Sequence, residues 1–525
     1  MFKGQPKGLI AAALANMGER FGFYIMMAVL TLFISAKFGL SETTTGYIYS
    51  AFYALIYVLA LVGGLIADKT KNYKGTILAG LVLMAIGYLI LSIPTPTPVP
   101  SLAMYLGLTC LGLFVIAFGN GLFKGNLQAL VGQMYDNPQY ASNRDAGFQI
   151  FYMFINIGGF FAPWIAIGVR NWWLKANAFD YNAGLPELCH EYLKLGDGMT
   201  AQRMENLKTM ADQVSLNGQH VSDLGAFVNS YLDVFNRGFQ YAFVAAIFAM
   251  LISLVIYLVN KKRFPDPGKK VVATAANASA ANTAAASKEE IKMDAREIKQ
   301  RIYALFAVFG VVIFFWLSFH QNGYSLTYFA RDYVNLDVIN IDLGFTTIKG
   351  AEIFQCVNPF FVVALTPLIM WFFGNMRKKG KEPSTPKKIA IGMGIAALAY
   401  IFLMIVSLAL PSKDALAGMS AADAASIRVT PFVMIGMYFI LTVAELFISP
   451  LGLSFVSKVA PPHLQGVMQG CWLAATAVGN SLLFIGGLLY TQVPIWACWL
   501  VFVGATGMSM IVMLSMVRWL ERVAK

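Results

Sequence analysis

The chain has 525 residues, of which 58% are hydrophobic and 13% are charged, and its mean hydropathy is +0.63. Soluble globular proteins carry about 25% charged residues, so this composition excludes a set of water-soluble domains. The net charge of +12 does not indicate nucleic-acid binding, because the Lys and Arg residues lie in short clusters between long apolar runs. We therefore predict an all-α polytopic membrane protein.

A membrane-spanning helix needs about 20 mostly apolar residues, and about twelve segments of the sequence meet this requirement. The first begins a few residues into the chain, contains charges and lacks a small-residue cleavage site, so we interpret it as a retained helix and not as a signal peptide. We expect helices near 8–36, 44–68, 75–93, 102–134, 146–169, 238–260, 300–324, 346–374, 389–410, 430–456, 464–490 and 495–517.

Two polar stretches interrupt this series. Residues 171–236 form an insertion between the fifth and sixth expected spans, with a helical pattern at 201–214, and residues 264–298 form a polar linker. We expect a six-helix bundle over 1–263 and a second one over 299–525, which is the 6+6 layout of major facilitator transporters. Twelve spans alone would also fit other carriers and some membrane enzymes.

Basic residues mark one side of the expected helices, whereas connections on the other side, such as 94–101, carry no charge. By the positive-inside rule, both termini are then cytoplasmic and the insertion lies outside. The basic side comprises Lys3, Lys7, Lys69, Lys71, Lys74, Lys261, Lys262, Arg263, Arg377, Lys378, Lys379, Lys381, Arg518 and Arg522.

Several charged or titratable residues lie deep inside apolar segments. A charge at the centre of a bilayer costs at least about 2.5 to 3.5 kcal/mol, so each one needs a partner or a water-filled cavity. Intramembrane charges are therefore functional candidates by default. They are Glu19 and Arg20 in the first span, Lys124 in the fourth, His320 in the seventh and Glu445 in the tenth.

These residues fall into two chemical sets. Arg20 and Lys124 could hold a carboxylate, whereas Glu445 together with Asn156 and Asn358 could hold an ammonium group. The implied ligand is zwitterionic, with a free amino end and a free carboxyl end, as in a short peptide.

Structural roles are the alternative for each of these charges. Glu19 and Arg20 could neutralise each other as a packing pair, and Lys124 with Glu445 could be a tether between the two bundles. A single His in an apolar span is often only a satisfied polar residue, so His320 is an equally good structural candidate. The five cysteines show no paired spacing, and we expect neither a metal site nor a catalytic one.

Six segments, in order, resemble signatures of the proton-dependent oligopeptide transporter family. The first, from Asn16 to Tyr24, is similar to the E-x-x-E-R-F-x-Y-Y signature, and Gly63 to Lys69 is similar to the family's version of the major facilitator loop motif. Similar patterns occur at 145–158, 354–359, 444–450 and 468–480. The resemblance covers nearly the whole chain outside the two polar stretches.

This resemblance implies symport of protons with di- and tripeptides by alternating access. It implies a carboxylate site, an amino-terminus site and side-chain pockets lined by tryptophan. The residues expected to bind substrate are Arg20, Tyr24, Tyr57, Lys124, Asn156, Trp316, Asn358, Glu445 and Trp472.

The same resemblance implies further roles. Glu19, Arg20, His320 and Glu445 are the expected proton-coupling residues, and Lys124 with Glu445 is the expected gate between the halves on the cytoplasmic side. No cofactor is expected besides the coupling protons.

The sequence also departs from the family pattern. Asn16 stands where the family's first signature Glu would be, so one candidate proton carrier is absent. Met27 and His320 replace two residues that can form an outer ion pair in relatives, and Phe23 replaces a signature Tyr.

Two other functions remain open from the sequence. One is a carrier of another small anion such as nitrate, and the other is a transporter-like receptor in which proton coupling is altered or lost. We expect a monomer in the bacterial cytoplasmic (inner) membrane, in contact with lipid and without nucleic acid. The insertion at 171–236 could act as a lid or dock a periplasmic partner.

Overall fold

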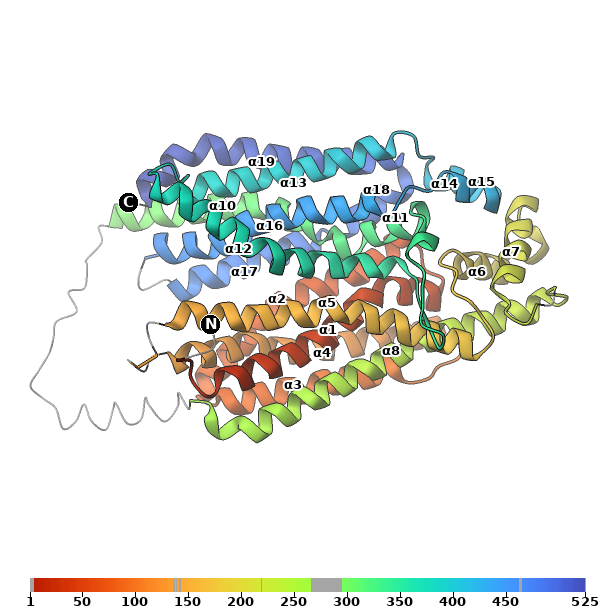
Figure 1. The fold of residues 1–525 in the computed structure, drawn as a ribbon, viewed down its shortest axis with the longest axis horizontal. Helices are drawn as coiled ribbons and strands as arrows, with labels where there is room; N and C mark the ends of the chain where they lie inside the picture. Colours follow the sequence, from red (N-terminus) through yellow and green to blue (C-terminus); the bar gives the residue numbers. More distant parts are fainter. Residues whose placement is uncertain are drawn as a thin grey trace, which may run out of the picture.

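The computed structural model describes residues 4–135, 137, 139–140, 143–218, 220–265, 295–461 and 465–524, so nearly all of the expected linker at 264–298 lies outside the described residues. The first half of the chain contains six long helices (Figure 1). They are α1 (Leu9–Phe38), α2 (Glu42–Thr70), α3 (Tyr73–Ser92), α4 (Leu102–Met134), α5 (Arg144–Ala176) and α8 (Leu224–Asn260).

The second half builds its spans from both continuous and broken helices. The described residues contain 12 segments that are long and apolar enough to cross a membrane, which confirms the predicted fold class. The elements that build these second-half spans are α10 (Ala295–Phe319), η4 (His320–Gly323), α11 (Ser325–Tyr333), η6 (Ala351–Cys356), α12 (Val357–Lys378), α13 (Thr385–Ser407), α16 (Phe432–Val459), α17 (Gln465–Ser481), α18 (Phe484–Gln492) and α19 (Ile495–Val523).

Three spans of the second half differ from the expected continuous helices. The seventh changes to a 3₁₀ turn at His320–Gly323 and continues as α11, and the eleventh breaks between α17 and α18. Gln321 joins the two breaks, because its Nε2 donates to the Leu483 carbonyl at 3.1 Å. The eighth begins at Ala351 and not near 346, because a short hairpin of β1 (Ile341–Asp342) and β2 (Thr347–Ile348) precedes it. Apolar periodicity does not report these breaks, since the backbone groups that they free find partners elsewhere in the protein.

The insertion is shorter than the 171–236 expected from the sequence. Helix α5 continues to Ala176 and α8 already begins at Leu224, and aromatic residues of both added ends are packed. Trp173 lies on Tyr241 at 4.7 Å between ring centroids, and Tyr231 stacks on Phe227 at 5.6 Å. The part between them holds α6 (Leu185–Leu195), the 3₁₀ turn η2 (Gly196–Gly198) and α7 (Ala201–Val214). The helix predicted at 201–214 is confirmed.

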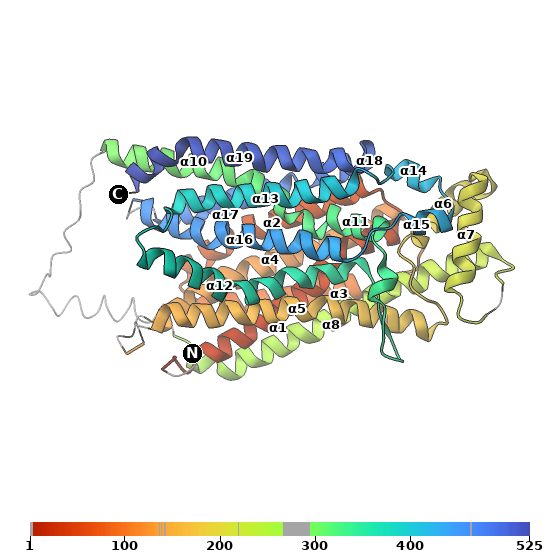
Figure 2. The same ribbon diagram turned by 45° about the horizontal axis from the view of Figure 1, so that its top comes forward.

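The long helices lie roughly side by side along the molecule, with α6, α7 and two short helices, α14 (Lys413–Ala417) and α15 (Ala421–Ser426), at one end (Figures 1 and 2). We call this the insertion end, and we call the opposite end, where both chain termini lie, the terminal end. Within the first half, α1 packs on α5 and α8, and α3 packs on α4; in the second half, α13 packs on α16 and α19. The halves meet where α2 contacts α17 and α18 and where α5 contacts α12 and η6.

Polar contacts between the halves concentrate at the insertion end. Ser35 Oγ of α1 lies 2.7 Å from the Tyr328 hydroxyl of α11. Arg170 of α5 forms an ion pair with Glu352 of η6, and both side chains are fully buried. The halves are therefore joined more firmly at this end than elsewhere along their contact.

Close helix packing in the first half depends on glycine. A Cβ on Gly63 of α2 would lie 2.1 Å from the Gly121 carbonyl oxygen of α4, whereas a Cβ on the next residue, Gly64, would meet no atom within 4 Å. Two helices approach this closely only where small residues face each other.

We predict that Gly63→Ala destabilises the protein and that Gly64→Ala does not. The Cβ at 63 forces α2 and α4 apart, and overpacking of this kind costs about 1 to 3 kcal/mol. Thermal unfolding of both variants in detergent, followed by tryptophan fluorescence, measures the difference. Equal melting temperatures for the two variants would contradict the close contact of α2 with α4.

Candidate functional site

A cavity lies between the two halves, near the middle of the long helices. Its walls combine aromatic rings, amides and one carboxylate. The lining residues are Phe23, Tyr24, Met27, Tyr49, Tyr53, Tyr152, Ile155, Asn156, Gly159, Pro163, Asn322, Gly323, Gln355, Asn358, Pro359 and Glu445.

The second half contributes the negative charge of the cavity. Glu445 lies on α16, one turn before Pro450, and accepts a hydrogen bond of 2.9 Å from Nδ2 of Asn358 on α12. The same Asn358 amide donates to Oγ1 of Thr442 at 3.0 Å. The carboxylate keeps acceptor capacity on the side of the cavity, so this wall suits a positively charged or hydrogen-bond-donating ligand group.

The first half contributes two cations, and one of them is already paired. Arg20 donates two hydrogen bonds of 2.5 Å to the two carboxylate oxygens of Glu19, its neighbour in sequence. Asn120 of α4 donates a third bond of 2.9 Å to Glu19. Both charged side chains are nearly inaccessible to solvent, with 6% of Arg20 and none of Glu19 exposed. Arg20 is therefore held by Glu19 in this structure.

Asn16, which replaces the family's first signature Glu, lies on the same helix. Its side chain is 3% exposed, and its Nδ2 has no hydrogen-bond partner among the described residues. A neutral amide at this position leaves Glu19 as the carboxylate paired with Arg20.

The second cation, Lys124 of α4, forms no ion pair or hydrogen bond with the described residues. Its Nζ lies 5.2 Å from the ring centroid of Tyr57 on α2, at cation–π distance. The predicted pair of Lys124 with Glu445 is not formed here, since Glu445 binds Asn358 instead. The cytoplasmic gate stays a prediction.

Three tyrosines of α2 form a column beside the cavity. Tyr49, Tyr53 and Tyr57 are spaced four residues apart, and their ring centroids follow each other at 5.6 and 6.1 Å. The sequence reading included Tyr57 but missed Tyr49 and Tyr53, although the i, i+4 spacing of the three was visible.

His320 lies where the two halves meet. Its ring stacks on Trp316 at 4.9 Å and contacts Tyr53 of the first half at 4.6 Å between ring centroids. Its Nδ1 lies 2.6 Å from Oδ1 of Asn480 on α17, within hydrogen-bond distance. His320 is thus a buried, hydrogen-bonded residue that also reaches the first half.

The expected side-chain pockets lined by Trp316 and Trp472 are not supported by their positions. Neither residue is among those lining the cavity, and both are buried among second-half helices, 7% and 3% exposed. Trp472 packs against Phe309 and fills the space beside Gly452, where a Cβ would lie 2.0 Å from its ring. The side-chain pockets stay a prediction.

The structure thus brings some predicted residues together and separates others. Tyr24, Asn156, Asn358 and Glu445 line one cavity, whereas Glu19, Arg20, Tyr57 and Lys124 are not among its lining residues. Asn120 and Gln355 were missed, and uncharged polar residues inside long apolar spans were the signal that could have found them.

The family profile described as the POT family matches residues 74–288 and 268–495. The chain belongs to the POT family. It is 27% identical over 491 residues to "Peptide transporter YePEPT" of Yersinia enterocolitica subsp. palearctica serotype O:3 (strain YE-P4), covering 91% of this chain and 87% of the relative. It is 26% identical over 532 residues to "Dipeptide and tripeptide permease B" of Shigella dysenteriae serotype 1 (strain Sd197), covering 99% and 96%.

Solved POT structures share the fold. A crystal structure of "peptide transporter POT in complex with sulfate" has 23% sequence identity and a TM-score of 0.69, covering 100% of this chain and 96% of the other. A POT family transporter in complex with 5-aminolevulinic acid has 22% identity and a TM-score of 0.68, covering 100% and 98%. This protein is accordingly a multi-pass membrane protein of a transporter family and not an enzyme.

We predict that Asn358→Ala destabilises the protein by about 1 to 3 kcal/mol, because Glu445 loses its hydrogen-bond donor. Asn156→Ala is the matched control, since the Asn156 amide donates to the Tyr152 carbonyl of its own helix. Thermal unfolding in detergent measures both. In a Glu445→Gln background, Asn358→Ala should cost less, and an unchanged cost would show that the bond to Glu445 does not stabilise the fold.

Proposed function

We propose that this protein imports di- and tripeptides together with protons, by alternating access, across the bacterial inner membrane. The insertion end faces outward and both termini are cytoplasmic, as the basic clusters of the sequence indicate. The observation that carries the proposal is the division of charge. A carboxylate and the amide of Asn358 lie on the second-half wall of the cavity, and the first half holds Arg20, paired with Glu19, and Lys124, which forms no ion pair with the described residues.

The two ends of a peptide match these groups. Glu445 and Asn358, with Asn156 across the cavity, receive the ammonium group, and Lys124 and Arg20 receive the carboxylate. The tyrosines of the cavity pack against the peptide backbone and side chains. The relatives named as peptide transporters, and the family member solved with 5-aminolevulinic acid, which also carries amino and carboxyl ends, support this assignment.

The pair of Glu19 and Arg20 suggests how a proton couples to the peptide. Two of the five guanidinium N–H donors and the positive charge of Arg20 are engaged by Glu19, so Arg20 binds a ligand carboxylate less well while Glu19 is ionised. Protonation of Glu19 removes the opposite charge and frees Arg20 for the peptide carboxylate. Release of the peptide then restores the pair and the proton leaves.

A carrier of nitrate fits this cavity less well. Glu445 places a carboxylate in the wall, and a carboxylate repels a small anion that has no ammonium group to offer.

We predict that Glu445→Gln and Lys124→Ala each lower the uptake of labelled dialanine by at least about tenfold, since each variant loses a charge that binds one end of the peptide. Uptake into proteoliposomes under an imposed inward pH gradient measures the effect. Unlabelled dipeptide should compete with the label, and nitrate should not.

Matched controls for these two variants lie on α7 of the insertion. Glu205→Gln and Lys208→Ala remove the same charges from exposed side chains, and both should transport normally. Normal accumulation by Glu445→Gln or Lys124→Ala would refute the site assignment.

We predict that Glu19→Gln abolishes accumulation driven by a pH gradient but retains exchange of labelled for unlabelled peptide. A neutral amide leaves Arg20 free without a proton, so binding persists while coupling is lost. His320→Gln is the matched comparison and should retain both activities. If Glu19→Gln still accumulates peptide under a pH gradient and His320→Gln no longer does, the coupling role belongs to His320 and not to Glu19.

A further inference from the structure

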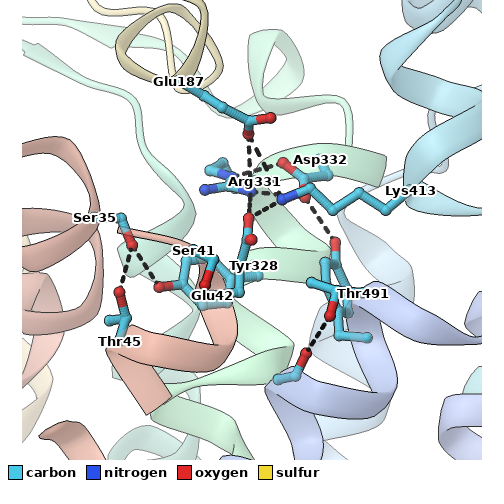
Figure 3. Close-up of polar contacts among 12 residues, drawn as sticks. Ser35, Ser41, Glu42, Thr45, Glu187, Tyr328, Arg331, Asp332, Lys413 and Thr491 are labelled. Atoms are coloured by element: carbon cyan, nitrogen blue, oxygen red, sulfur yellow. Dashed lines mark hydrogen bonds and ion pairs between the residues drawn. The ribbon is translucent and has the colours of Figure 1, made fainter. Parts of the chain in front are cut away.

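Four charged side chains that pair across the halves meet at the insertion end, two acids from the first half and two cations from the second (Figure 3). The two acids belong to the first half: Glu42 begins α2, and Glu187 lies on α6 of the insertion. The two cations belong to the second half: Arg331 lies on α11, and Lys413 begins α14. We call these four residues the charge cluster.

Each cation of the charge cluster contacts each acid. Arg331 Nη2 lies 2.8 Å from Oε1 of Glu42 and 3.9 Å from Oε2 of Glu187. Lys413 Nζ forms an ion pair with Glu42 and lies 3.6 Å from Oε2 of Glu187. All four pairs therefore join one half to the other.

The charge cluster is largely shielded from water. The side chains of Arg331 and Glu42 are 7% and 9% exposed, and Lys413 is 14% exposed, whereas Glu187 on the insertion is 43% exposed. Asp332 supports Arg331 through a contact of 2.6 Å and itself accepts from the Tyr490 hydroxyl at 2.8 Å. Shielded pairs are stronger than surface pairs, and a charge that loses its partner there is costly.

The insertion is fixed to the first half and reaches across to the second. His190 Nε2 of α6 lies 2.6 Å from the Ala36 carbonyl oxygen at the end of α1. On the other side, Asn206 of α7 donates to the Met419 carbonyl at 2.7 Å and accepts from the Ala421 amide at 3.0 Å. The insertion therefore moves with the first half and must leave α15 when the halves part at this end.

We propose that Glu42, Glu187, Arg331 and Lys413 form the outer gate of this transporter, with one of the four charges supplied by the insertion. The proposal rests on the proposed function, because alternating access requires the halves to separate at the outer end. Opening breaks all four pairs together, and the side chains then become hydrated on opposite walls. Within this account, the insertion is part of the gate and not a separate docking domain.

Arg170 and Glu352 also join the halves at this end, but this ion pair is more deeply buried than the charge cluster. Both side chains are fully buried, Arg170 packs 3.8 Å from the Tyr181 ring, and it donates to the Lys349 carbonyl at 3.0 Å. Water has no access to these charges, in contrast to Glu187, so breaking this pair would add a larger cost to opening at this end than breaking the pairs of Glu187.

The test measures the opening of the outer end directly. Spin labels at Ser101, before α4, and Leu408, after α13, report the separation of the halves, and labels at Glu205 and Asp423 report that of the insertion from α15; all four side chains are exposed. Double electron–electron resonance is recorded on the full-length protein in lipid nanodiscs without peptide. Glu187→Gln should raise the population with a long distance about two- to fivefold for both label pairs.

Asp197→Asn is the matched control, because it removes one acid from an exposed position of the same insertion. It should leave both distance distributions unchanged. If Glu187→Gln leaves the distance between the labels at 101 and 408 unchanged, the halves do not separate and the gate is overturned. If only the distance between the labels at 205 and 423 lengthens, the insertion detaches from α15 without opening the halves. Glu42→Gln repeats the test at the shielded acid, and an effect of Glu187→Gln without one of Glu42→Gln also overturns the four-residue gate.

Failure of this proposal can be told apart from failure of the proposed function. The distances are measured without substrate, whereas uptake of dialanine by the unmodified protein tests peptide transport. If Glu187→Gln lengthens the distances but the unmodified protein takes up no dialanine, the gate is supported and the peptide substrate is rejected. If the unmodified protein takes up dialanine but Glu187→Gln leaves the distances unchanged, the substrate is supported and the gate is rejected.

Discussion

A charge held away from water needs a partner, and this requirement organises the polar residues of the protein. Glu19 has Arg20 and Asn120, Arg170 has Glu352, and the charge cluster neutralises itself across the halves. Lys124 differs from these residues, since among the described residues it forms no ion pair or hydrogen bond and lies over the face of Tyr57. In the proposed function, the carboxylate of the peptide supplies the missing partner.

The fold makes this arrangement available because its halves meet along two flanks and leave a cavity between them. Helix α2 contacts α17 and α18 on one flank, and α5 contacts α12 and η6 on the other. Breaks in the second-half spans place Asn322 and Gln355 on the cavity wall, where an unbroken apolar helix would offer no polar backbone or side chain. The aromatic column of α2 then links this wall with Lys124.

Long apolar runs predicted the number and type of the spans, because hydropathy depends only on local composition. The association of Glu445 with Asn358 also followed from the sequence, since a polar group inside a span must find another. The sequence did not predict which residues the other side chains would contact. Trp316 and Trp472 pack inside the second half and do not line the cavity. Glu42, Arg331 and Lys413 look in sequence like ordinary charges at the ends of helices. Tertiary packing decides both outcomes, and no periodicity encodes it.

The location of an ion pair relative to the two halves determines what can break it. A pair within one half, such as Glu19 with Arg20, keeps its geometry when the halves rock, so only a proton or a ligand changes it. A pair between the halves, such as Glu42 with Arg331, is broken by rocking whatever the protonation of the cavity. Coupled transport needs both kinds, because the proton and the peptide must act on the first kind while the movement acts on the second. In the proposed mechanism, the separation of these two kinds of pair, one in the first half and one at the outer end, therefore lets binding in the middle of the membrane control opening at its surface.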